Sequence, residues 1–164
     1  MDIFRIAETE NGLSEEVIRE AVLSSLERRR VRRALILPPD FTRFHSNAGF
    51  ITNIYYHALK ERGAEVDILP ALGTHEMVTQ EQAEKMYGDI PYDVLIPHNW
   101  RTDVVKLGEV PGAFLEEITE GLWHDPVSVE INRLVMDERY DLIISPGQVV
   151  PHEVIGMSNH AKNL

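Results

Sequence analysis

Short continuous runs of apolar residues alternate along this chain with longer segments in which apolar residues recur every three or four positions. Continuous runs are typical of strands buried on both faces of a parallel sheet, and the longer spacing is typical of amphipathic helices. We therefore predict strands and helices in alternation. The predicted strands are residues 34–37, 66–69, 94–96, 127–131 and 142–144, and the predicted helices are 15–30, 47–62, 79–88 and 132–139.

Capping signals support two of these helices. Ser14 precedes two acidic residues, a pattern that favours a helix start, and the arginines at 28–30 would lie in the last turn, where the helix dipole favours cations. Thr79 and Gln82 have the spacing of a capping box, and Gly88 suits a helix end.

The alternation predicts an α/β fold: a doubly wound, mostly parallel sheet with helices on both faces, similar to the Rossmann arrangement. Residues 101–126 interrupt the pattern, and Pro111-Gly112 predicts a turn within a hairpin or insertion. The sequence contains no internal repeat, low-complexity tract or linker-like stretch. We therefore predict that residues 1–164 form a single domain.

Composition narrows the class of protein. The chain has 164 residues with 16 basic and 27 acidic side chains, so its formal net charge is −11. Nucleic acids and membrane surfaces bind positively charged proteins, and we expect neither as a partner. The absence of cysteine excludes thiolate metal sites and cysteine nucleophiles. No apolar run has the length of a signal peptide core or a membrane span, so we expect a cytoplasmic protein.

Polar side chains follow the predicted strands at their carboxyl ends, where open parallel α/β sheets bind ligands. Asp40 and Arg43 follow the first strand, His75 the second, His98 the third and His152 the last. Any one of these histidines could serve a local turn. Together they predict a polar cleft that binds an anion and transfers protons near neutral pH.

Several common sites are absent from the sequence. No G-x-G-x-x-G turn follows the first predicted strand, so a standard dinucleotide site is disfavoured. The chain also lacks a G-x-x-x-x-G-K-S/T phosphate loop, an H-E-x-x-H zinc pair and a G-x-S-x-G nucleophile elbow. We expect no tight binding of nickel or zinc by these residues alone.

Three ordered segments resemble the nickel-pincer lactate racemases. The first two are Pro39-Asp40-Phe41-Thr42-Arg43, similar to the family's D-x-T-R segment, and Gly73-Thr74-His75, similar to its G-T-H segment. The third matches the family's P-H-x-x-x-G-x-S-G-G-x-K at Pro151, His152, Gly156, Ser158 and Lys162. The resemblance covers roughly residues 34–162.

The resemblance implies an isomerase that interconverts the stereoisomers of 2-hydroxy acids. Its implied cofactor is a nickel-pincer nucleotide, a pyridinium mononucleotide with two thio-acyl groups, tethered through Lys162. His75 and His152 would be the catalytic acid and base, one on each side of the substrate carbon. Arg43 and Asp40 would form the substrate-binding site, in which Arg43 binds the anion and Asp40 holds the cofactor or orients a neighbour.

In the family a second, C-terminal domain supplies the nickel ligand and the other wall of the cleft. The resemblance therefore implies that the isolated 164-residue chain is inactive and lacks the cofactor. Glu76 and Asn159-His160 stand where the family has an arginine and a double glycine. These differences favour an alternative, a non-catalytic α/β module that binds a small carboxylate or a protein partner. A third alternative is an unrelated α/β domain whose motif matches are coincidental.

Overall fold

Three parallel strands form the main sheet of the protein, for which the computed structural model describes residues 2–154 and 156–159. The strand order is β2 (Glu65–Ile68), β1 (Arg33–Ile36) and β5 (Leu142–Ile144), and both neighbouring pairs are parallel. The central residues 34–36 are fully buried, as the continuous apolar run predicts. The predicted α/β architecture with a parallel sheet is confirmed.

The predicted strand at 94–96 is reduced to a single bridge. Leu95 pairs with Ile68 in the parallel orientation, and the N–H of Ile96 donates to the carbonyl oxygen of Ile68 at 2.7 Å. Residues Tyr92–Val94 form the 3-10 helix η2 instead. Pro97 follows directly and has no N–H with which to continue a ladder, so the pairing cannot extend.

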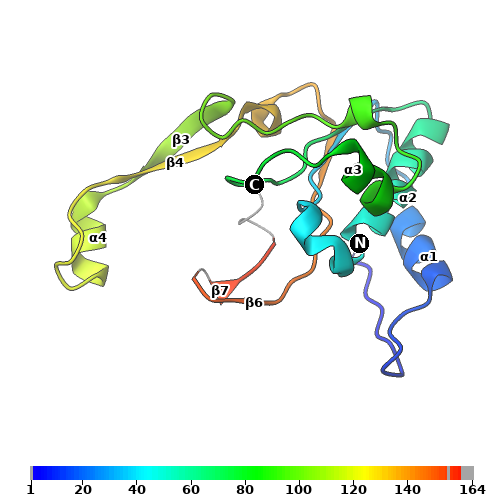
Figure 1. Ribbon diagram of the computed structural model, residues 1–164, viewed down its shortest axis with the longest axis horizontal. Coiled ribbons are helices and arrows are strands. Elements are labelled where there is room, and N and C mark those ends of the chain that lie inside the picture. Colours follow the sequence, from blue (N-terminus) through cyan, green and yellow to red (C-terminus); the bar gives the residue numbers. More distant parts are fainter. Residues whose placement is uncertain (1, 155, 160–164) are drawn as a thin grey trace.

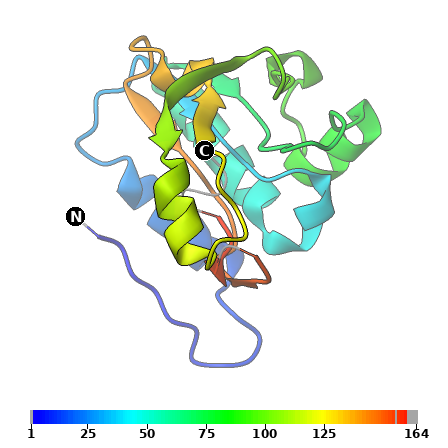
Figure 2. The same ribbon diagram turned by 90° about the vertical axis from the view of Figure 1, so that its left-hand side faces the viewer.

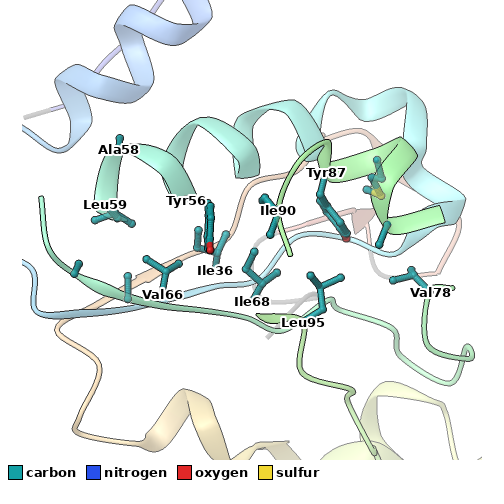
Figure 3. Close-up of a cluster of buried hydrophobic side chains, with 14 of the residues drawn as sticks. Ile36, Tyr56, Ala58, Leu59, Val66, Ile68, Val78, Tyr87, Ile90 and Leu95 are labelled. Carbon is teal, nitrogen blue, oxygen red and sulfur yellow. The ribbon is translucent and has the colours of Figure 1, made fainter. Parts of the chain in front are cut away.

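Helices α2 (Ala48–Glu61) and α3 (Gln80–Tyr87) cover one face of the sheet, and the end of α1 (Glu15–Ser25) reaches the same face. Burial of apolar side chains between these helices and the sheet stabilises the packing of the two layers. The packed side chains include those of Ile36, Tyr56, Ala58, Leu59, Val66, Ile68, Val78, Tyr87, Ile90 and Leu95 (Figure 3). Helices α2 and α3 approach closely at Gly49, where an added Cβ would lie 2.0 Å from the carbonyl oxygen of Met86.

Helix α1 ends at Ser25, so the prediction that it continues to the arginines at 28–30 is wrong. Leu26 is only 1% exposed because it packs into the core, and Arg28 has a left-handed φ of 59°. The carbonyl oxygen of Leu26 accepts a hydrogen bond at 2.6 Å from Nη1 of Arg62, at the end of α2. Two arginines therefore bind this helix end: Arg29, whose Nε donates to the carbonyl oxygen of Ser25 at 3.0 Å, and Arg62, which comes from a distant part of the sequence.

The opposite face of the sheet carries a smaller apolar cluster. Leu35, Leu37 and Leu69 pack there against residues that include two from the 3-10 helix η3 (Arg133–Met136). The predicted helix at 132–139 is therefore this short 3-10 helix. The described residues that pack on this cluster include none from an α-helix, so the doubly wound arrangement with helices on both faces stays a prediction.

Residues 104–132 form an arm that projects from the main sheet (Figure 1, Figure 2). Strands β3 (Val104–Val110) and β4 (Val127–Asn132) pair antiparallel, and α4 (Gly112–Ile118) lies at the tip. The predicted hairpin or insertion is confirmed, and the predicted strand at 127–131 forms outside the main sheet.

None of the described helices is long and apolar enough to cross a membrane.

Candidate functional site

A cleft with a volume of about 540 Å³ opens at the carboxyl ends of β1 and β2. The segment after β1 contributes Asp40 and Arg43, the segment after β2 contributes His75, and the Leu95 bridge leads to His98. The base of the arm contributes further lining, as do Gly147, Gln148, Val150, Ser158 and Asn159. The structure thus brings together four of the polar residues that the strand-exit argument placed at one edge, in a cavity of the size of small-molecule sites.

Asp40 is a buried carboxylate, 6% exposed, with both oxygens engaged. It caps the 3-10 helix η1 (Phe41–Ser46), because its Oδ1 accepts hydrogen bonds from the backbone N–H of Thr42, at 3.0 Å, and from the Thr42 hydroxyl. Its Oδ2 accepts a hydrogen bond from Nδ1 of His75. Of the two roles that the resemblance implies for Asp40, this geometry favours the orientation of a neighbour.

The hydrogen bond to Asp40 decides which nitrogen of His75 faces a ligand. Nδ1 carries the proton that it donates to the carboxylate, so Nε2 is left as an acceptor when the ring is neutral. The side chain is 58% exposed and lines the cleft. The carboxylate would stabilise the imidazolium formed when Nε2 takes up a proton. The arrangement can therefore serve general base or general acid catalysis.

Arg43 places a cation on the same wall of the cleft. Its backbone N–H donates to the carbonyl oxygen of Asp40 at 3.0 Å, which fixes the residue in the first turn of η1. Its side chain is exposed, and in residues 2–154 and 156–159 it forms no ion pair with an acidic group. Such a guanidinium can bind a carboxylate through two parallel hydrogen bonds.

His98 lines the cleft next to Asn132, the last residue of β4. Nδ2 of Asn132 lies 2.9 Å from Nδ1 of His98, and Asn132 is 7% exposed. Burial lowers the pKa of the His98 imidazole, and the carboxylate of Asp103 opposes this effect. The sequence analysis gave His98 no individual role and did not single out Asn132. Asn132 directly follows the predicted strand at 127–131, and this position could have marked it as a candidate site residue.

His152 lies in a small hairpin formed by β6 (Pro151–His152) and β7 (Gly156–Met157). Its Nδ1 accepts a hydrogen bond at 3.1 Å from the backbone N–H of Val154, and it is not among the residues that line the cleft. The structure therefore brings His75 to the cleft but not His152. Lys162, predicted to tether the cofactor, lies outside the described residues.

The two differences from the family motifs lie in different surroundings, and His160, which belongs to the second, lies outside the described residues. Asn159 lines the cleft with a φ of 62°, in the left-handed region that favours glycine and that asparagine tolerates better than most residues. Gly147 packs against this side chain, because an added Cβ would lie 2.6 Å from Oδ1 of Asn159. Glu76 is exposed and does not line the cleft.

A protein family described as the lactate racemase N-terminal domain matches this chain over residues 7–164. The chain belongs to that family. The match includes the segments that carry Asp40, Arg43 and His75, and it confirms the resemblance drawn from the three motifs. A comparison with curated proteins gave no match.

A solved structure supports the fold of this lactate racemase N-terminal domain. The crystal structure of a protein from Thermotoga maritima is similar to it, with a TM-score of 0.82 and 28% sequence identity. The similarity covers 94% of this chain and 37% of the Thermotoga chain. The chain therefore spans little more than a third of the length of that protein.

The cleft of this lactate racemase N-terminal domain has room for the implied nickel-pincer nucleotide, and its described lining includes the guanidinium of Arg43 as well as the carboxylates of Asp40 and Glu130. Its volume of about 540 Å³ is sufficient for a mononucleotide, and Arg43 can bind a phosphate or carboxylate group. In the part of the chain that the structure describes, no three His, Asp or Glu side chains are grouped to hold a metal ion.

Proposed function

We propose that this domain is the N-terminal catalytic part of a 2-hydroxy-acid racemase or epimerase that acts in a longer protein. The observation that carries the proposal is the Asp40–His75 pair, which lies with Arg43 in one cleft. Membership of the lactate racemase family supports the substrate class, a small carboxylate with a hydroxyl on the adjacent carbon.

Each of the three residues has a distinct task in this proposal. Arg43 binds the substrate carboxylate through paired hydrogen bonds. Nε2 of His75 takes the hydroxyl proton and returns it when the alcohol is formed again, while Asp40 stabilises the imidazolium between these steps. When bound, the nickel-pincer nucleotide supplies the acceptor and donor for the hydride of the substrate carbon.

The roles of His152 and Lys162 are proposed from the family motif. His152 would serve the substrate isomer whose hydroxyl points away from His75. His152 lies in the β6–β7 hairpin, and Ser158, which directly follows β7, lines the cleft. Lys162 would provide the amine that tethers the nucleotide. A C-terminal domain would close the cleft, so we expect the isolated domain to be inactive.

The test uses the full-length protein encoded by the reading frame that contains this chain, produced together with the enzymes that make the cofactor. We expect it to interconvert the stereoisomers of a 2-hydroxy acid, assayed with a panel that includes lactate by chiral chromatography. Mass spectrometry is expected to show a covalent adduct on Lys162. An unmodified Lys162 together with the absence of racemase activity would overturn the proposal.

A histidine variant tests the proposed base directly. His75→Gln is expected to lower the rate in both directions about 10²–10⁴-fold, the usual effect of removing a general acid or base. His57→Gln is the matched control, because His57 also pairs with an aspartate, Asp89 at 2.8 Å, but does not line the cleft. Equal rates in the two variants would exclude His75 as the base.

A second candidate function is carboxylate binding without catalysis. Asn159 favours it, because its side chain lines the cleft at a position where the family has glycine. This candidate predicts that the full-length protein binds lactate while Lys162 remains unmodified in the presence of the cofactor-making enzymes. If Asn159→Gly then restores the adduct, the asparagine is the feature that separates this protein from the racemases.

A further inference from the structure

Two histidines of the cleft differ in their hydrogen-bond partners, because one faces a carboxylate and the other faces a side-chain amide. His75 faces the carboxylate of Asp40, which can only accept a hydrogen bond. His98 faces the amide of Asn132, which has one donor end and one acceptor end. The orientation of that amide therefore decides which nitrogen of His98 carries the proton.

A second contact fixes the orientation of the Asn132 amide. Its Oδ1 accepts a hydrogen bond at 2.9 Å from the backbone N–H of Leu134, and a backbone N–H is always a donor. Nδ2 must therefore be the atom that faces Nδ1 of His98, at 2.9 Å. Because Nδ2 can only donate, Nδ1 accepts, and the neutral imidazole carries its proton on Nε2.

The same contact keeps the His98 ring uncharged. A proton on Nδ1 would oppose the Nδ2 donor of Asn132 and leave both groups unpaired, and burial lowers the pKa of the ring in the same direction. The acidic group that faces His98 is Asp103, which has Arg133 at 3.7 Å to offset its charge. In the described ranges no atom hydrogen-bonds to Nε2 of His98, so this N–H is available to a ligand in the cleft.

We propose that His98 is a substrate-binding residue whose Nε2–H, held by Asn132, donates a hydrogen bond to the carboxylate of the 2-hydroxy acid that Arg43 binds. This inference rests on the proposed function, and neither His98 nor Asn132 belongs to the three family motifs. Asn132 is a positioning residue, since it acts through the imidazole. The uncharged donor orients the substrate while His75 remains the histidine that gains and loses a proton.

The first experiment measures the proton position by NMR of the histidine ring nitrogens in this chain. We expect His98 to show an unprotonated Nδ1 and a protonated Nε2 at pH 7.5. In Asn132→Asp the carboxylate still accepts from Leu134 but can no longer donate to His98, so the ring proton is expected to move to Nδ1. A proton on Nδ1 of His98 in the wild-type chain would overturn the proposal.

The second experiment is a titration of the full-length protein with lactate, followed through the NMR signals of Arg43 and His75. His98→Gln and Asn132→Asp are each expected to weaken lactate binding about tenfold or more, as loss of one hydrogen bond to a charged group does. His57→Gln serves as the control with unchanged affinity, and backbone amide spectra verify that each variant is folded.

The outcomes separate the two proposals. Lactate that shifts the Arg43 and His75 signals but binds His98→Gln with wild-type affinity would overturn the role of His98 alone. Lactate that leaves the wild-type signals of Arg43 and His75 unchanged would overturn the proposed function, and the donor role of His98 would fall with it.

Discussion

Nδ1 of His75 donates a hydrogen bond to Oδ2 of Asp40, a residue that lies 35 positions earlier in the chain. Two parallel neighbouring strands, β1 and β2, end at the same edge of the sheet and bring these residues together. Thr42 occupies the other oxygen of the same carboxylate. The pair therefore has one fixed geometry before any ligand enters the cleft.

The first prediction concerns Asp40→Asn. The amide would present a donor to Nδ1 of His75, so the ring proton is expected to move to Nε2 and the base would be lost. We expect a fall of about 10²-fold or more in the racemase rate of the loaded full-length protein. Asp89→Asn alters the comparable pair with His57 and should leave the rate unchanged. A wild-type rate in Asp40→Asn would contradict the role of Asp40.

The second prediction concerns the contact of α2 with α3. In Gly49→Ala the new Cβ would lie 2.0 Å from the carbonyl oxygen of Met86, so the helices must separate. We expect the free energy of unfolding to fall by about 1–3 kcal/mol, the usual cost of overpacking, measured by urea denaturation. Gly108→Ala is the control, because no atom lies within 4 Å of its added Cβ. Equal stability of the two variants would show that α2 and α3 do not approach as described.

The third prediction concerns acid pH. Burial lowers the pKa of folded His98 below the value of about 6.5 found in unfolded chains, so the unfolded state binds more protons as the pH falls. The contribution of His98 to stability is therefore present above about pH 6.5 and is lost as the pH falls toward its folded pKa. Urea titrations at several pH values should show a smaller loss of stability on acidification in His98→Gln than in the wild type. A larger loss in the variant would contradict the sign of this pKa shift.

The fourth prediction concerns the arm. Strand β3 and helix α4 contain no buried residue, so they contribute little to the core. Replacement of residues 107–129 by an Asn-Gly turn should close the remaining hairpin and change the free energy of unfolding by no more than about 1 kcal/mol. Circular dichroism during urea denaturation measures this change, and loss of cooperative unfolding would show that the arm is part of the folding unit.

Local signals in the sequence were sufficient to predict much of the main sheet and the helices that cover it. The apolar runs at 34–37 and 142–144 and the largely apolar segment 66–69 predicted the three parallel strands. The Thr79 capping box with Gly88 predicted the bounds of α3. These signals work at short range, because an apolar run and a capping box each consist of residues close together in the chain.

Tertiary contacts decided the elements that the sequence did not predict correctly. Helix α1 ends at Ser25, where Leu26 enters the core and Arg62, from the end of α2, binds the carbonyl group of Leu26. The strand at 127–131 has the alternation of any strand, and nothing in that pattern distinguishes a partner in the main sheet from a partner in the arm.

For the cleft, the sequence by itself determined that Asp40, Arg43, His75 and His98 would meet at one edge, because parallel strands present their carboxyl ends together. Only the tertiary structure decided how they are paired. A hydrogen bond requires a donor and an acceptor within about 3 Å, and strand periodicity fixes no position that closely. The buried carboxylate beside His75 and the buried amide beside His98 were therefore set by packing, and they give the two histidines their different proton positions.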